Sequence, residues 1–196
     1  MSQFDASASA IAALAAFNTA YAEASANNGE GGQGEWPPSG SHNCTVTGIT
    51  IKMEQGKEFN DKNTPGGAKL KLDGVFVQFL YRCDDLFPGQ KDPTQPLDWK
   101  GASFFIPTDP SKCVGKNDWM IRMPAERLKG HLRIINGADN PNIQAALTQA
   151  LSTINSRQVH VEVDIQERPG SQTAEQKASG KPAPVYKTEF LKQLLA

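Results

Sequence analysis

Two glycines that interrupt strand patterns constrain the fold of this chain more than any other feature. In NCTVTGITIKM, the apolar residues change from one alternation phase to the other at Gly48. In AKLKLDGVFVQFLYRC, a new alternating run of large apolar residues begins directly after Gly74. A glycine at such a phase change predicts a β-bulge or a sharp bend, which strands need in order to curl into a small barrel.

Three further segments predict strands, and two predict helices. Residues 100–107 (KGASFFIP), 157–167 (RQVHVEVDIQE) and 185–194 (VYKTEFLKQL) alternate as strands do. Between the first two of these, one helix is expected with Pro124 in its first turn and Gly137 as its stop. A second helix is expected to begin at a cap on Asp139 or Asn140, with Pro141 in its first turn.

The order strand, strand, strand, helices, strand, strand predicts an α+β fold that is mainly β. Five strands with helix between the third and the fourth favour a five-stranded OB-type Greek-key barrel, with a helix insertion and an N-terminal helical arm. The alternative is an α+β sandwich with a helix pair on one sheet face. One domain with flexible parts also fits the length of 196 residues.

The N-terminal part predicts a helix followed by a linker. Residues 4–25 favour helix, with a narrow apolar stripe that consists of Phe4, Ile11, Leu14, Phe17 and Tyr21. This stripe packs either on its own domain or on another protein. Residues 27–34 resemble a linker in composition, and Trp36-Pro37-Pro38 is expected to cap the barrel. The predicted division is residues 1–39 for the helix and acidic Gly-rich tether, and residues 40–196 for the OB-like domain.

The charge is distributed unevenly along the chain. The net charge is −1, but residues 1–40 hold four acidic side chains and no Lys or Arg. The remainder holds 20 basic and 17 acidic side chains, a net charge of +3. A mildly basic body is compatible with a polyanionic ligand.

Motifs for catalysis, metal binding and membrane insertion are absent from the sequence. There is no Gly-rich phosphate loop, G-x-S-x-G or H-E-x-x-H, so we expect no enzyme activity and no cofactor. His42 and Cys44 could pair with Cys83 or Cys113 around a metal, but no C-x-x-C spacing supports this, and we expect no metal. The three cysteines suit reduced thiols, and no apolar run reaches membrane-span length, so a cytoplasmic protein that does not bind membranes is expected.

Aromatic and basic residues are interleaved in the predicted strands and their connections. Single-stranded nucleic acid is bound by aromatic rings that stack on bases and by cations along the backbone path. We therefore predict phosphate contacts from Lys69, Lys71, Arg82, Lys100 and Arg122, and base stacking on Phe76, Trp99, Phe105 and Trp119. The long polar loop before residue 185 adds Lys177 and Lys181 as ligand-facing cations, because long loop tips are often functional.

Several short motifs together resemble a family that tailed bacteriophages and prophages encode. They are a helix ending near FNTAYAEAS, an acidic Gly-rich tether, EWPPSGSH, CTVTGITIK, RLKGHLRIING, and RQVHVEVDIQE with PVYKTEF. Much of that family is catalogued as a domain of unknown function. It is regarded as similar to single-stranded-DNA-binding proteins and is often encoded near recombination and replication genes. Here the loops at residues 55–67 and 83–100 look longer, and the end EFLKQLLA lacks an acidic tail.

The resemblance and the residues imply the same function. The expectation is a phage-type, sequence-tolerant single-stranded-DNA-binding protein that acts in DNA replication or recombination. We further expect a recombination or replication protein to dock on the N-terminal helix, and the chain to form a homo-oligomer. The alternative is a phage adaptor or structural protein that docks a protein partner through its N-terminal helix.

Overall fold

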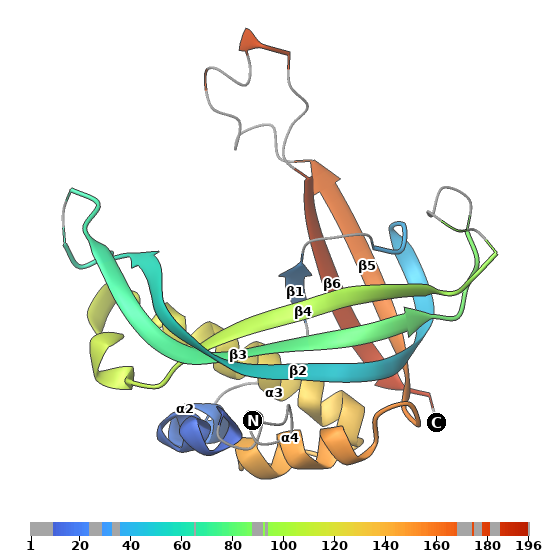
Figure 1. Cartoon of the computed structure of the whole chain (residues 1–196), viewed down its shortest axis with the longest axis horizontal. Helices are drawn as coiled ribbons and strands as arrows, with labels where there is room; N and C mark the ends of the chain where they lie inside the picture. The colour runs from blue at the N-terminus through green and yellow to red at the C-terminus, as the bar shows by residue number, and fades with distance from the viewer. Residues whose placement is uncertain are drawn as a thin grey trace.

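The computed structural model describes residues 10–23, 29–32, 36–64, 66–87, 92, 94–167, 174, 178–180 and 185–195. An antiparallel sheet forms the larger part of the molecule, and helices cover one side of it (Figure 1). The predicted α+β, mainly β class is therefore confirmed. None of the helices among these residues is long and apolar enough to cross a membrane.

The sheet contains five long strands and one short strand. The long strands are β2 (Gly40–Asn60), β3 (Lys69–Cys83), β4 (Leu97–Pro107), β5 (Gln158–Glu167) and β6 (Val185–Leu194). The short strand β1 (Gly29–Gly32) pairs with β6, and the spatial order is β1-β6-β5-β2-β3-β4. All five pairings are antiparallel. Among the described residues no hydrogen-bonded ladder joins β4 to the other end of the sheet, so the expected barrel is corrected to a strongly curled, open sheet.

Strand β2 bends where the sequence places glycine. Its register with β3 shifts between Val46 and Gly48, and again between Glu54 and Lys57. The second shift contains Gly56, whose φ of 62° lies in the left-handed region. Residues 40–45 of β2 pair with β5, while residues 44–60 pair with β3. The bends thus let one strand belong to both halves of the curled sheet.

The helices lie on one side of the sheet (Figure 1), and they begin at other residues than predicted. Helix α3 (Trp119–Asn136) starts five residues before Pro124, which therefore lies inside the helix. Gly137 ends it with a φ of 70°, as expected. Helix α4 (Ile143–Ser152) is capped by Asn142, whose side chain accepts a hydrogen bond from the Ala145 N–H at 2.9 Å. The predicted cap lay two or three residues too early.

The N-terminal helical segment packs against the same domain. The apolar stripe of the 3-10 helix η1 (Leu14–Phe17) and helix α2 (Asn18–Glu23) is buried, with Leu14, Phe17 and Tyr21 each 1% exposed. Asn18 Oδ1 accepts a hydrogen bond from the Ile143 N–H at 2.9 Å, which attaches this segment to the start of α4. The apolar stripe therefore packs on its own domain, which is the first of the two alternatives. Phe4 lies outside the described residues.

The segment predicted to be a linker contains a strand, and Trp36 and Pro37 of the Trp-Pro-Pro segment are buried, whereas Pro38 is exposed. Residues 29–32 pair with residues 187–190 of β6. Trp36 is 6% exposed and packs edge-on against Trp99, with ring centroids 4.9 Å apart. The chain before Gly40 therefore contributes both a sheet strand and a core side chain.

A buried carboxylate connects the two ends of the curled sheet. Glu189 on β6 is fully buried, and its Oε2 accepts a hydrogen bond from the Ala102 N–H of β4 at 2.8 Å. Its Oε1 accepts from the Tyr81 hydroxyl at 3.1 Å and lies 2.9 Å from His131 Nε2 of α3. Side-chain contacts therefore join β4 to β6 where a backbone ladder is lacking.

Candidate nucleic-acid interface

The sheet face opposite the main core carries several of the predicted site residues. Val75, Val77, Phe79 and Tyr81 of β3 point into the core, so Phe76 and Arg82 lie on the other face. Phe76 is paired with Lys52 of β2 on one side and with Phe105 of β4 on the other. The register therefore aligns one cation and two aromatic rings across three strands.

Further aromatic and basic side chains gather beside this row. We call the group the aromatic–lysine cluster; it consists of Phe59, Phe76, Phe105, Trp119, Lys52, Lys57 and Lys62. The rings of Phe59 and Phe105 lie 5.2 Å apart. Lys57 Nζ lies 4.8 Å from the Phe105 centroid, and Lys52 Nζ lies 4.9 Å from that of Phe76. Lys62 Nζ lies 4.5 Å from the Trp119 ring. All four rings are half-buried, so they combine packing with partial access.

A pocket opens within the cluster, between β4 and the start of α3. Its empty volume is about 500 Å³, including space that is open to solvent. The lining side chains are mostly apolar or aromatic, and one is a cation: Phe59, Ser103, Phe104, Phe105, Trp119, Met120, Met123, Pro124 and Arg127. Walls of this composition can receive a flat, partly polar ring such as a nucleobase.

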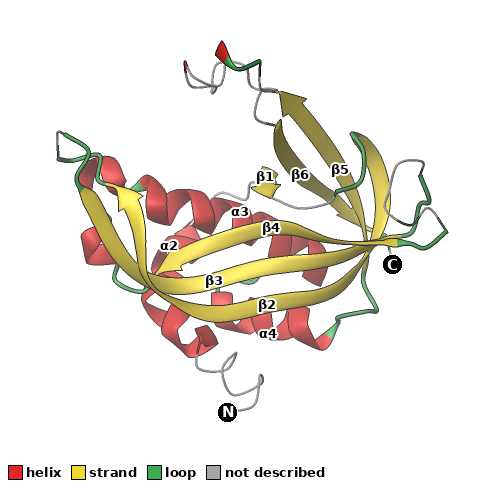
Figure 2. Ribbon diagram, turned by 45° about the horizontal axis from the view of Figure 1, so that its top comes forward, coloured by secondary structure: helices red, strands yellow, loops and turns green. Residues whose placement is uncertain are grey.

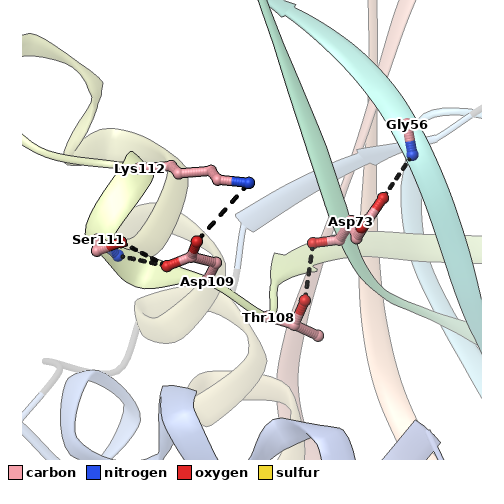
Figure 3. A network of polar contacts seen from close by, with 6 residues as sticks. All are labelled: Gly56, Asp73, Thr108, Asp109, Ser111 and Lys112. Atoms are coloured by element: carbon pink, nitrogen blue, oxygen red, sulfur yellow. Dashed lines mark hydrogen bonds and ion pairs between the residues drawn. The ribbon is translucent and has the colours of Figure 1, made fainter.

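Glycine and short polar contacts fix the position of the Phe105 ring. A Cβ atom on Gly74 would meet Phe105 Cζ at 2.5 Å and the Ile106 carbonyl oxygen at 2.6 Å, so only glycine leaves room for this ring. The neighbouring Asp73 accepts a hydrogen bond from the Gly56 N–H at 2.8 Å, and its carbonyl accepts from the Thr108 hydroxyl at 3.1 Å (Figure 3). These contacts hold the bulge of β2 and the end of β4 on both sides of β3.

The connection from β4 to α3 is ordered by its own side-chain contacts. Asp109 Oδ1 accepts hydrogen bonds from the Ser111 N–H and hydroxyl, and Asp109 Oδ2 lies 3.7 Å from Lys112 Nζ (Figure 3). They cap the 3-10 helix η2 (Pro110–Lys112). The hydrogen bonds from Ser111 hold the pKa of Asp109 below its usual value. These contacts therefore fix the connection that leads from β4 to Trp119.

The tip of the β2–β3 hairpin is attached to the 3-10 helix η3 (Gly115–Asn117), and this attachment positions Lys62. Asn117 is buried; its side chain donates to Asp61 Oδ1 at 2.7 Å and accepts from the Lys62 N–H at 2.9 Å. Asn63 Nδ2 donates to the Val114 carbonyl at 2.8 Å. The hydrogen bonds to Asp61, that from Asn117 first, hold its pKa below the usual value. Lys62 is thereby held above Trp119 by the backbone.

The cluster carries more positive than negative charge. Glu54 contacts both Lys52 and Lys57, with an N–O distance of 3.3 Å in each pair, while Lys62 adds a third positive charge. Lys69 and Lys71 lie on the adjacent hairpin, where Lys69 donates to Asn60 and Lys71 pairs with Glu58 at 3.1 Å. Arg122 pairs with Glu126 in the first half of α3. These three predicted cations are exposed near the cluster.

Trp99 is a correction, because it belongs to the core. It is 3% exposed and packs between Trp36 and Tyr81, whose ring centroids lie 4.9 and 5.0 Å from its own. Strand β4 starts at Leu97, earlier than predicted, and its register with β3 shifts between Gln78 and Leu80. The bulge changes which residues face inward, so the alternation in residues 102–107 could not be extended back to Trp99.

The remaining predicted residues lie elsewhere. Arg82 and Lys100 are exposed at the far end of the same sheet face, about 20 Å from Phe76 along β3 for Arg82, given a rise of about 3.3 Å per residue. Arg82 forms two hydrogen bonds with Asp98, at 2.9 and 3.4 Å. Lys177 and Lys181 lie outside the described residues.

Sequence reasoning missed four members of the cluster: Lys52, Lys57, Phe59 and Lys62. It assigned residues 55–67 to a polar connection, whereas β2 continues to Asn60. The available signal was the two-residue spacing of Lys57 and Phe59, which places both on one face of a strand that continues to Asn60. The glycine at position 56 concealed it, because glycine is typical of both loops and bulges.

Comparisons of the chain with protein-family models, with curated proteins and with solved structures find no match.

Proposed function

We propose that this chain is a phage-type single-stranded-DNA-binding protein that acts in replication or recombination without base specificity and without catalysis. The aromatic–lysine cluster is the observation that carries the proposal. It places lysine side chains over half-buried aromatic rings, and this combination is typical of proteins that bind single strands.

The energies of the contacts in the free and bound states favour ligand binding. In the free protein Lys52, Lys57 and Lys62 lie over the ring faces. A cation–π contact at an exposed site contributes about 0.5–1 kcal/mol, whereas stacking of a base on an aromatic side chain contributes about 1–3 kcal/mol. A base can therefore displace the ammonium group from a ring, and the released lysine can bind a neighbouring phosphate.

The topology supports an OB-type assignment within this proposal. In OB folds the face of the second and third strands, together with the loops that follow the first and fourth strands, binds oligonucleotides. If β2 to β6 are the five barrel strands, these parts are the β3–β4 face, the β2–β3 hairpin and the β5–β6 connection. The β2–β3 and β5–β6 hairpins project from the sheet in different directions (Figure 2). The cluster lies on the first of these hairpins and on the β3–β4 face.

The test is a salt-dependent titration of the full chain with oligo-dT, read by anisotropy of a labelled strand. The affinity should fall linearly with salt on logarithmic axes, because each phosphate contact contributes a slope of about −0.7 on single strands. The double variant Lys52→Gln/Lys57→Gln should flatten the slope by about 1.4. The control variant Lys112→Gln/Lys192→Gln removes two exposed, ion-paired lysines outside the cluster and should leave the slope unchanged.

Tryptophan emission locates the ligand independently. Trp36 and Trp99 are nearly fully buried, whereas Trp119 is half-buried in the pocket wall. Oligo-dT should therefore quench mainly Trp119, and Trp119→Phe should bind the strand while losing the quenching. The proposal fails if neither quenching nor an anisotropy change occurs at low salt. A signal that is equal in the cluster variant and the control variant would place the ligand elsewhere on the protein.

A further inference from the structure

Four side chains with metal-binding atoms share one face of the β2–β3 ladder, at the end away from the aromatic–lysine cluster. Cys44 pairs directly with Cys83. Because side chains two residues apart lie on the same face, His42 lies beside Cys44, and Asp85 extends the face beyond Cys83. The Asp84 N–H donates to the Asn43 carbonyl at 3.0 Å, which continues the pairing past the end of β3. The pattern His-x-Cys on one strand thus faces Cys-x-Asp on its neighbour.

The donor atoms converge. One donor atom from each of His42, Cys83 and Asp85 lies within 4.8 Å of the other two. His42 Nδ1 is 3.2 Å from Asp85 Oδ2. Tetrahedral zinc with bonds of about 2.0–2.3 Å requires separations of about 3.3–3.8 Å between its ligand atoms. The nitrogen–oxygen distance of 3.2 Å is just below this range, and the Cys83 sulfur lies within 4.8 Å of both atoms.

The orientation of His42 suits a metal. Its Nε2 lies 2.8 Å from the Pro38 carbonyl oxygen, so Nε2 carries a proton that it donates. Nδ1 faces Asp85 Oδ2 at 3.2 Å, a contact that either a proton or a metal cation between the two atoms can bridge. A backbone carbonyl that holds the second nitrogen of a histidine is also the usual support of a metal ligand.

Cys83 supplies the sulfur donor. Cys83 and its neighbour Cys44 are buried and unbridged. Thiolate, imidazole and carboxylate together are the ligands of zinc.

We propose that His42, Cys83 and Asp85 bind a zinc ion, which leaves its fourth position open to water. The site closes the end of the sheet where Trp36 and Pro38 lead into β2. It shares no residue with the aromatic–lysine cluster, so it stands or falls independently of the proposed function.

The test uses the full chain, purified without chelator, and measures zinc per chain after dialysis, followed by replacement with Co²⁺. We expect one tightly bound zinc and a cobalt spectrum with a sulfur-to-metal charge-transfer band and strong tetrahedral d–d bands. Asp85 is exposed, so Asp85→Asn should fold and weaken Zn²⁺ binding by at least the factor of about 10–100 caused by changes outside the ligand shell. The adjacent Asp84→Asn changes the same charge and should leave affinity unchanged.

Cysteine variants test the sulfur ligand. Cys83→Ser should abolish the cobalt charge-transfer band, whereas Cys113→Ser, in a separate apolar cluster, should not. The proposal is overturned if the wild-type chain retains no zinc and its cobalt spectrum lacks the thiolate band, or if Asp85→Asn and Asp84→Asn bind Zn²⁺ equally. It is also overturned if the freshly purified chain has a mass two hydrogens lower, which would show a Cys44–Cys83 disulfide.

Discussion

Replacement of Glu189 by leucine should destabilise the protein severely, because this carboxylate connects β6 to the edge strand β4. The change removes an acceptor of the Ala102 N–H and of the Tyr81 hydroxyl, and the partner of His131 Nε2. Burial and the negative charge of Glu189 raise the pKa of Tyr81 well above its usual value, so its hydroxyl stays protonated and needs an acceptor.

Two estimates of the loss agree. Two buried donors without a partner, the Ala102 N–H and the Tyr81 hydroxyl, cost about 2–6 kcal/mol together. Removal of one member of a buried ion pair costs about 3–5 kcal/mol as a whole. Both ranges centre on about 4 kcal/mol, which is the expected fall in the free energy of unfolding. With a urea m-value of about 2 kcal/mol/M, the unfolding midpoint should fall by about 2 M.

The assay is urea unfolding followed by the emission of the buried Trp36 and Trp99. The control is Glu162→Leu on the neighbouring strand β5, where the carboxylate is 48% exposed and pairs with Lys192. It should change stability by about 1 kcal/mol or less. In a double-mutant cycle, Glu189→Leu and His131→Leu should couple by at least about 1 kcal/mol. A loss for Glu189→Leu no larger than that for Glu162→Leu, or strict additivity with His131→Leu, would refute the proposed role of the network.

Two further predictions concern the supports of the aromatic–lysine cluster. Gly74→Ala should displace the Phe105 ring and lower the free energy of unfolding by about 1–3 kcal/mol, measured by urea unfolding; Gly48→Ala, where a Cβ meets a flexible Leu80 methyl at 3.1 Å, should cost less. The pKa of Asp61 is lower in the folded protein than its ordinary value of 3.8. The hydrogen bonds of Asp61 therefore stabilise the hairpin tip fully at pH values above 3.8, and this stabilisation is lost as the pH falls through the lower pKa of the folded state. The chemical shift of the Lys62 amide should change with pH as Asp61 becomes protonated, and this change should be absent in Asp61→Asn. A Lys62 shift that does not depend on pH in the wild type would contradict the prediction.

The sequence by itself determined the elements and their order. Alternation identified the five long strands, and the helical spacing identified α3 and α4, because both patterns record which side chains face a core. The phase change at Gly48 located the first register shift of β2, whereas near Gly74 the extra residue lies in the partner strand, between Glu54 and Lys57 of β2. Phe76, Phe105 and Trp119, which were selected from local sequence, lie in the aromatic–lysine cluster.

Only the tertiary structure decided which residues meet. A bulge in β4 turned Trp99 into the core, and the continuation of β2 past Gly56 brought Lys57 and Phe59 to Phe105. The convergence of His42 with Cys83 and Asp85 depends on a strand register that no local pattern encodes. Among the described residues, β4 and β6 are joined through the buried side chain of Glu189 and not through a backbone ladder. Local patterns report burial and direction, whereas contacts between distant residues depend on register, and a one-residue bulge changes register without altering composition.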